Sequence, residues 1–89
     1  MKTFTKQNID FGVFLKLENS QKDPYSLSVN LEILVLINGV KLALKVPRKI
    51  LFKVLELKEN DEVLIYWKET EDKKLVLNWI EVLDKHFYN

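Results

Sequence analysis

One stretch, residues 37–83, decides the fold; it reads INGVKLALKVPRKILFKVLELKENDEVLIYWKETEDKKLVLNWIEVL. In order it contains a tight turn, a strand, one short helix, a strand, another turn and a last strand. Its Asn38-Gly39 pair favours a type I′ hairpin turn, because both central positions of that turn need a positive φ. The sequence therefore predicts a hairpin whose second strand turns every second residue inward: Val40, Leu42, Leu44 and Val46.

Two alternating stretches precede this hairpin. In residues 9–17 the apolar side chains fall on every second position, which predicts a strand with one buried face made of Ile9, Phe11, Val13, Leu15 and Leu17. Gly12 on the other face predicts a bulge or a sharp bend. The polar residues 18–25 are predicted as the longest loop. Residues 26–37 alternate again, with an inward face made of Leu27, Val29, Leu31, Ile33, Val35 and Ile37.

A short helix is predicted after the hairpin. Pro47 suits the first helical position, since its missing N–H would have no partner there. Apolar side chains follow at helical spacing for about three turns, namely Ile50, Leu51, Val54 and Leu55. The pair Asn60-Asp61 reads as a turn that ends the helix.

The last part of the segment predicts two more strands. They cover residues 62–68 and 74–83 and are joined by a charged hairpin tip at 69–73. The alternation slips near Trp79-Ile80, which predicts a β-bulge. Both tryptophans, Trp67 and Trp79, are expected in the core because they lie on strongly apolar strands.

The resulting order is β-β-β-α-β-β in a single domain, residues 1–89. Strands dominate and nearly all connections are short, which favours a mainly β fold: a small five-stranded barrel with one short helix. Closing the barrel also removes strand edges that would otherwise be adhesive.

Several classes of function lack their chemistry here. The chain has no cysteine and one histidine, His86, which has no partner in the sequence. No nucleophile motif or glycine-rich phosphate loop is present, so we expect no enzyme, no metal, no cofactor and no small-molecule substrate. The first residues lack the apolar segment of a signal peptide, and no apolar run approaches membrane-spanning length. We therefore expect a cytoplasmic protein that does not contact a membrane.

Charge is distributed unevenly although the net charge is only +1. Residues 38–58 hold a single acid, Glu56, among six basic residues: Lys41, Lys45, Arg48, Lys49, Lys53 and Lys58. Residues 59–89 are rich in acids. The folded surface would then have a basic and an acidic pole, and the basic pole suits a polyanion such as nucleic acid.

From Ile37 onward the chain resembles the swapped-hairpin DNA-binding domains of the AbrB/SpoVT type. These domains show a strand, a Pro-Lys/Arg pair that opens a short helix, and then Leu-Gly-Leu-x-x-Gly-Asp-x-Val before a hairpin. The matching residues are Val46, Pro47, Arg48, Lys49, Leu55, Leu57, Lys58, Asp61 and Val63. The sequence departs from the pattern at Glu56 and Asn60, which replace two glycines, and it lacks the usual mid-helix arginine near Phe52 and Lys53.

This resemblance implies a homodimer that exchanges hairpins and binds duplex DNA in the manner of a transcription regulator. It assigns the phosphate contacts to the basic residues of the hairpin and helix: Lys41, Lys45, Arg48, Lys49 and Lys53. Among them, Arg48 is best suited to a bidentate contact with a base or phosphate.

The order of elements over the whole chain looks like an OB-fold, which has three strands, a helix and a closing hairpin. That resemblance implies binding of single-stranded nucleic acid. Outward aromatic side chains beside lysines would then stack on bases: Phe14 beside Lys16, and Tyr66 beside Lys68. In either case phosphate contacts would make binding sensitive to salt.

A third hypothesis is a non-catalytic protein–protein interaction module. Here the basic block would be a solvated surface, and the outward apolar residues Leu34, Leu36, Leu64 and Tyr66 would form an interface with a second copy or another protein. Convergence of Lys41, Lys45 and Lys49 in one basic groove would favour nucleic acid, whereas their scatter around an apolar patch would favour protein. Duplex DNA is our first expectation from the sequence.

Overall fold

The computed structural model describes residues 7–19 and 31–83. Its elements are β1 (Gln7–Asn19), β2 (Leu31–Ile37), β3 (Val40–Lys45), a 3₁₀ turn η1 (Arg48–Ile50), α1 (Leu51–Val54), β4 (Glu62–Glu69) and β5 (Leu75–Val82). The predicted order β-β-β-α-β-β is confirmed. The predictions for residues 20–30 and for His86 lie outside the described residues.

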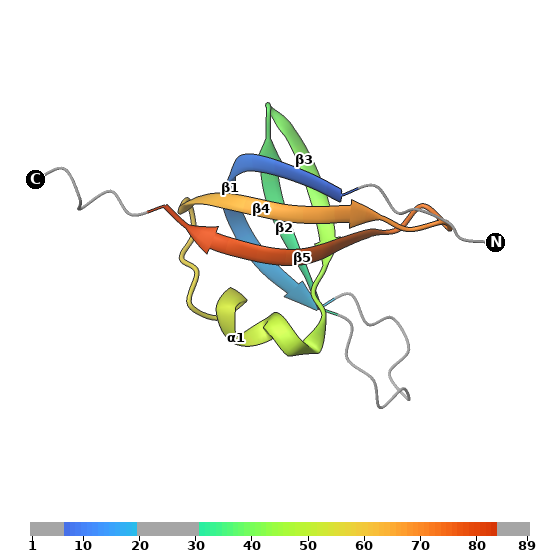
Figure 1. Cartoon of the computed structure of the whole chain (residues 1–89). Coiled ribbons are helices and arrows are strands. Elements are labelled where there is room, and N and C mark those ends of the chain that lie inside the picture. The colour runs from blue at the N-terminus through green and yellow to red at the C-terminus, as the bar shows by residue number, and fades with distance from the viewer. Residues whose placement is uncertain (1–6, 20–30, 84–89) are drawn as a thin grey trace, which may run out of the picture.

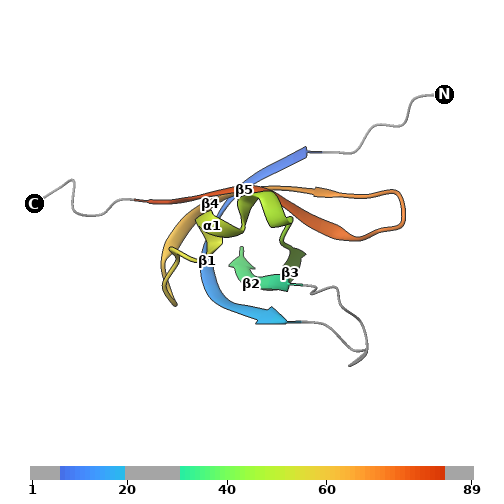
Figure 2. The same cartoon turned by 90° about the horizontal axis from the view of Figure 1, so that it is seen from below.

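The five strands close into a barrel in the order β1-β2-β3-β5-β4, with β4 paired back to β1 (Figures 1 and 2). All pairings are antiparallel except that of β3 with β5, which consists of the single parallel pair Lys45 and Val76. The small mainly β barrel is therefore confirmed. One chain closes it with its own strands, as in the OB-like alternative, so closure requires no hairpin from a second copy.

Gly12 lies near the point where β1 changes its pairing partner from β4 to β2. Residues 7–13 of β1 pair with β4 and residues 13–19 pair with β2. A Cβ atom at Gly12 would lie 2.7 Å from the carbonyl oxygen of Leu36 and 2.9 Å from Cδ1 of Ile65. No residue with a side chain fits without a shift of the neighbouring strands. β1 follows a strongly curved path in Figure 2, and its pairing changes from β4 to β2 around Val13, next to the predicted bend.

The inward face of β1 differs from the predicted one. Ile9 and Phe11 are 57% and 69% exposed, whereas Phe14 is 5% exposed and belongs to the core. The pairing register shifts between Phe14 and Lys16, and this bulge moves the inward face from even to odd positions. Of the five residues predicted to face inward, Leu17 packs against the core. The prediction that Phe14 is an outward stacking residue is wrong, because it was made without the bulge.

The β2–β3 hairpin follows its prediction closely. Asn38 and Gly39 have φ of 53° and 80°, so both central positions of the turn are in the left-handed region. Along β2 the predicted inward residues within the described range are buried or pack on the core: Leu31, Ile33, Val35 and Ile37. On the returning strand Leu44 and Val46 are buried, but Val40 is exposed because the hairpin tip extends past the core.

The helical segment is shorter than predicted. Pro47 has ψ of 145°, so it is still extended, and one 3₁₀ turn and one α-turn follow it. α1 lies over one end of the barrel (Figure 2); Ile50 and Val54 are buried in the core there, whereas Leu55 is exposed. α1 ends at Val54 and a turn follows it; farther along the chain, Asn60 takes a φ of 74° and its N–H donates to the carbonyl of Phe14 (2.8 Å). Within the described ranges, no helix has the length and apolar character needed to cross a bilayer.

The β4–β5 hairpin contains the predicted bulge. Tyr66 pairs with Trp79, but Trp67 pairs with Leu77, so Asn78 is an extra residue in β5. The bulge changes the phase of β5, which lets both Leu77 and Ile80 point into the core.

Candidate nucleic-acid interface

Four of the five predicted phosphate-binding residues lie along one side of the barrel. Lys41 and Lys45 are on the outer face of β3, with Ala43 between them, and Arg48 and Lys49 follow in η1. All four are exposed. The ion pairs formed within residues 7–19 and 31–83 involve other cations, so these four charges are unpaired among the described residues.

Lys53 does not belong to this group. Its Nζ lies 3.2 Å from Oε2 of Glu81 and 5.6 Å from the centroid of the Trp79 ring. The charge of Lys53 is therefore engaged by Glu81 of β5, next to the Trp79 ring. The sequence placed Lys53 with the other cations because the helix was expected to be long and to present one basic face.

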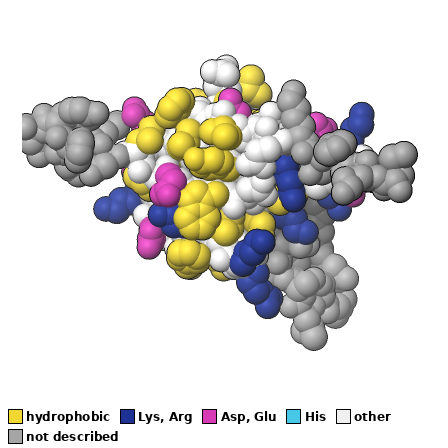
Figure 3. Space-filling view, viewed as in Figure 1, with side chains coloured by type: hydrophobic (Ala, Val, Ile, Leu, Met, Phe, Trp, Pro, Cys, Tyr) yellow, Lys and Arg dark blue, Asp and Glu magenta, His cyan; other side chains and the backbone are white. Residues whose placement is uncertain are grey.

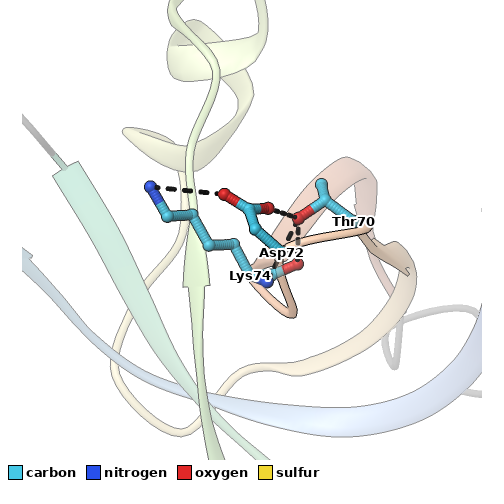
Figure 4. A network of polar contacts seen from close by, with 3 residues as sticks. All are labelled: Thr70, Asp72 and Lys74. Carbon is cyan, nitrogen blue, oxygen red and sulfur yellow. Dashed lines mark hydrogen bonds and ion pairs between the residues drawn. The ribbon is translucent and has the colours of Figure 1, made fainter.

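The tip of the β4–β5 hairpin adds charge near β3 (Figure 4). The Thr70 hydroxyl donates to Oδ1 of Asp72 (2.5 Å) and accepts from the backbone N–H of Lys74 (3.1 Å), and Nζ of Lys74 is 3.8 Å from Oδ2 of Asp72. The hydrogen bond from Thr70, with weaker help from the charges of Lys74 and Lys45, lowers the pKa of Asp72. Asp72 is therefore ionised at neutral pH and offsets part of the positive charge at this end.

Aromatic side chains form a second line beside the cations. Ile9, Tyr66 and Trp79 are direct cross-strand partners on the outer face of β1, β4 and β5. Phe52 of α1 continues the line, with its ring centroid 6.2 Å from that of Trp79 and an interplanar angle of 64°. We call Tyr66, Trp79 and Phe52 the aromatic row; the aliphatic Ile9 extends its apolar surface onto β1. Figure 3 shows apolar side chains gathered on this face, with Lys and Arg side chains along one border.

The row on one side of the aromatic row carries basic side chains, and the row on the other side carries apolar side chains and an acid. On one side, Gln7, Lys68, Val76 and Lys45 are successive cross-strand partners from β1 to β3. We call Lys68, Lys45, Arg48 and Lys49 the cationic row. On the other side, Phe11, Leu64 and Glu81 are partners. Adjacent rows are two residues apart along β1 and β4, which places them roughly 7 Å from each other there; on β5 the bulge separates Val76 from Trp79 by three residues.

Glu81 is the acid nearest the aromatic row, and its charge is engaged. Nε1–H of Trp79 donates to Oε1 of Glu81 (3.0 Å), and Lys53 binds the other oxygen. These two hydrogen bonds, the one from Trp79 first, lower the pKa of Glu81. The same contacts fix the orientation of the Trp79 indole on the surface.

The two tryptophans have different surroundings. Trp67 packs against the core, and its Nε1–H donates to Oδ2 of Asp10 (2.9 Å). Trp79 also packs against the core, as predicted, but it borders the exposed Phe52. The sequence alone did not single out Trp79 or Phe52 as surface residues, because the row that joins them depends on the pairing of strands distant in the chain.

The residues of the predicted protein interface are separated. Leu34 and Leu36 are on the outer face of β2, opposite Ala43 and Lys41 of β3. Leu64 and Tyr66 are on the outer face of β4 beside the aromatic row. The four residues therefore do not form the one patch that was expected.

A depression of about 430 Å³ lies where β1 bends past the β2–β3 turn. Its lining is mainly apolar and includes Phe11, Gly12, Val13, Leu36 and Leu83. Glu62 is the one ionisable residue in that lining. Throughout residues 7–19 and 31–83 there is no cluster of three or more His, Cys, Asp or Glu side chains that would hold a metal ion. Among the described residues, the cationic row and the aromatic row are therefore the best candidates for a binding site.

The sequence matches no protein-family model, and no curated protein is significantly similar to it.

Proposed function

We propose that the protein binds nucleic acid, with phosphates of the backbone on the cationic row. The proposal rests on one observation: Lys45, Arg48 and Lys49 follow one another from β3 into η1, exposed and without an ion pair among the described residues. Lys68 extends the same row across β5 to β4. A row of unpaired cations on a rigid barrel attracts a polyanion and needs no rearrangement to bind it.

The expected mechanism is release of counterions from the phosphates. Each phosphate that a Lys or Arg neutralises contributes about 0.7 to the slope of log K against log salt concentration for a single strand, and about 0.9 for a duplex. Three or four contacts from the cationic row would give a slope of roughly −2 to −4. Binding should therefore be measurable at low salt and should fall steeply as salt rises.

The double variant Arg48→Ala/Lys49→Ala is expected to bind at least about tenfold more weakly than the wild type at low salt, with a salt slope flatter by about 1.5. The fold should be unchanged, because exposed charges contribute little stability. Fluorescence anisotropy of labelled single-stranded and duplex oligonucleotides, at about 50 and 200 mM salt, measures both quantities.

The matched control is Lys16→Ala/Lys58→Ala, which removes the same charge from outside the cationic row. Lys16 is already paired with Glu18 (2.9 Å). This control should bind nearly as the wild type does. Equal losses in the two double variants would show an effect of net charge alone and would remove Arg48 and Lys49 from the proposal. Absence of binding by the wild type at low salt would end it.

A protein-interaction module is the second candidate. Two large apolar side chains are exposed on the face that carries the aromatic row: Phe52 (58%), which belongs to the row, and Phe11 (69%), which lies in the row next to it; this observation favours the second candidate. Sedimentation velocity of the wild type over a range of concentrations tests the homodimer that such a face would support.

A further inference from the structure

We propose that the nucleic acid is single-stranded and that two or three of its bases stack on the aromatic row. This inference rests on the proposed function and names its substrate class. Base stacking on protein aromatic rings is favourable for every base, because each base has a π face. The surface would therefore bind single strands with little preference for sequence.

The rings are held in place before a ligand arrives. The Trp79 indole is fixed by its hydrogen bond to Glu81 and by Lys53, whose Nζ lies over the ring at 5.6 Å from its centroid. Tyr66 is its direct partner on the neighbouring strand of the barrel, and Phe52 contacts it edge to face from α1. Rings that are already ordered lose little conformational entropy on binding, so most of the stacking energy is retained.

The two rows run in the same direction across the barrel. The cationic row passes from Lys68 on β4 to Lys45 on β3 and Arg48 in η1. The aromatic row passes from Tyr66 on β4 to Trp79 on β5 and Phe52 in α1. A single strand whose phosphates follow the cationic row can lay its unpaired bases over the aromatic row about 7 Å away.

This pairing of rows distinguishes between ligands. A duplex keeps its bases stacked inside, so it would contact the cations and leave the rings uncovered. A second copy or an apolar segment of another protein would cover the rings but would bring no anionic groups to Lys45, Arg48 and Lys68. A single strand satisfies both rows.

The acid beside the aromatic row does not oppose this assignment. Glu81 lies on the side of the row away from Lys68 and Lys45. Lys53 binds its carboxylate at 3.2 Å, which neutralises much of the repulsion that a phosphate would meet.

Trp79→Ala and Tyr66→Ala are each expected to weaken binding of a single-stranded oligonucleotide about tenfold. Their affinity for duplex should stay within about twofold of the wild type, and the salt slope should not change, because no charge is removed. Trp79→Phe keeps a ring and should bind nearly as well as the wild type. The control Trp67→Phe should bind normally, because Trp67 lies against the core with its N–H bonded to Asp10.

Tryptophan fluorescence gives an independent readout, because the chain has only two tryptophans. In Trp67→Phe the remaining indole is Trp79, and its emission should be quenched when the single strand binds. In Trp79→Phe the remaining indole is Trp67, and its emission should change little. Quenching in both variants, or in neither, would contradict stacking at the aromatic row.

The outcomes separate this inference from the proposed function. If Trp79→Ala and Tyr66→Ala bind single strands as the wild type does, while Arg48→Ala/Lys49→Ala is weakened, the nucleic-acid proposal stands and the stacking proposal is wrong. If the wild type binds neither form of nucleic acid, both fail. A dimer that sedimentation detects and Trp79→Ala dissolves would make the row a self-association surface and overturn the inference.

Glu81→Gln gives a prediction of opposite sign. The glutamine oxygen still accepts from the Trp79 indole, so the ring keeps its position, while the negative charge beside Lys53 is lost. Affinity for single strands should rise about two- to threefold at low salt, and the gain should fade as salt increases. Unchanged or lower affinity would show that the ligand does not approach this row.

Discussion

Phe14→Ala is expected to lower the free energy of unfolding by about 3–5 kcal/mol. The Phe14 ring is 5% exposed and lies within the core cluster, so its removal leaves a cavity and loses apolar burial. The matched control is three residues away on the same strand. Phe11 is 69% exposed, so Phe11→Ala should change the free energy of unfolding by no more than about 0.5 kcal/mol.

Urea unfolding followed by circular dichroism compares the two variants. Small domains have about 5–15 kcal/mol of stability in total, so Phe14→Ala can leave a large fraction unfolded. In that event Phe14→Leu supplies the measurement, since a smaller apolar side chain should cost about 1.5 kcal/mol. Similar losses for Phe11→Ala and Phe14→Ala would show that the inward face of β1 has been assigned incorrectly.

Gly12→Ala is expected to destabilise the barrel by about 2–3 kcal/mol. The added methyl group would lie 2.7 Å from the Leu36 carbonyl oxygen and 2.9 Å from the Ile65 side chain. The carbonyl belongs to the backbone of β2, so relief requires β1 and β2 to move apart. Thermal or urea unfolding of the variant measures the cost.

Gly39→Ala is the control for the loss of glycine itself. At Gly39 a Cβ would meet nothing within 4 Å, but φ is 80°, so the cost is conformational and should be about 1 kcal/mol. The expected loss of stability is thus larger at Gly12, where it comes from a steric clash, than at Gly39, where it comes from the backbone conformation. A Gly12→Ala variant that is as stable as the wild type would mean that the bend in β1 is less tightly packed than the structure shows.

Much of the fold could be predicted from local sequence patterns. The Asn38-Gly39 turn and the inward face of β2 each depend on residues that are close in the chain. The bulge in β5 was visible because Leu77 and Ile80 are both apolar and out of phase with each other.

The face of β1 could not be predicted in the same way. Both phases of this strand carry apolar residues, and the alternation of Ile9, Phe11 and Val13 is the more regular one. The structure uses the other phase as far as Phe14, since the contacts of Gly12 with β2 and β4 need a residue without a side chain on the inner face. As a result Ile9 and Phe11 are exposed, with Ile9 next to Tyr66 of the aromatic row and Phe11 next to Leu64.

For the candidate site, the sequence identified the charges but not their arrangement. Lys45, Arg48 and Lys49 are close in the chain, so their grouping was predictable. The aromatic row joins residues from β4, β5 and α1, and it depends on the β4–β5 register and on the packing of α1 against β5. The ion pair of Lys53 could not be predicted for the same reason, because its partner Glu81 is on a strand distant in the chain.

The position of β1 between β2 and β4 has a consequence for synthesis of the protein. As the chain leaves the ribosome, β1, β2 and β3 can pair as an antiparallel meander with short-range contacts. The inner face of that meander stays uncovered until β4 and β5 emerge, because β4 is the second partner of β1. The backbone of Phe14 also forms its hydrogen bonds with residues 60 and 61 only after these have been synthesised. Core formation is therefore a late step dominated by long-range contacts, and an incomplete chain presents its apolar strands to chaperones or to other nascent chains.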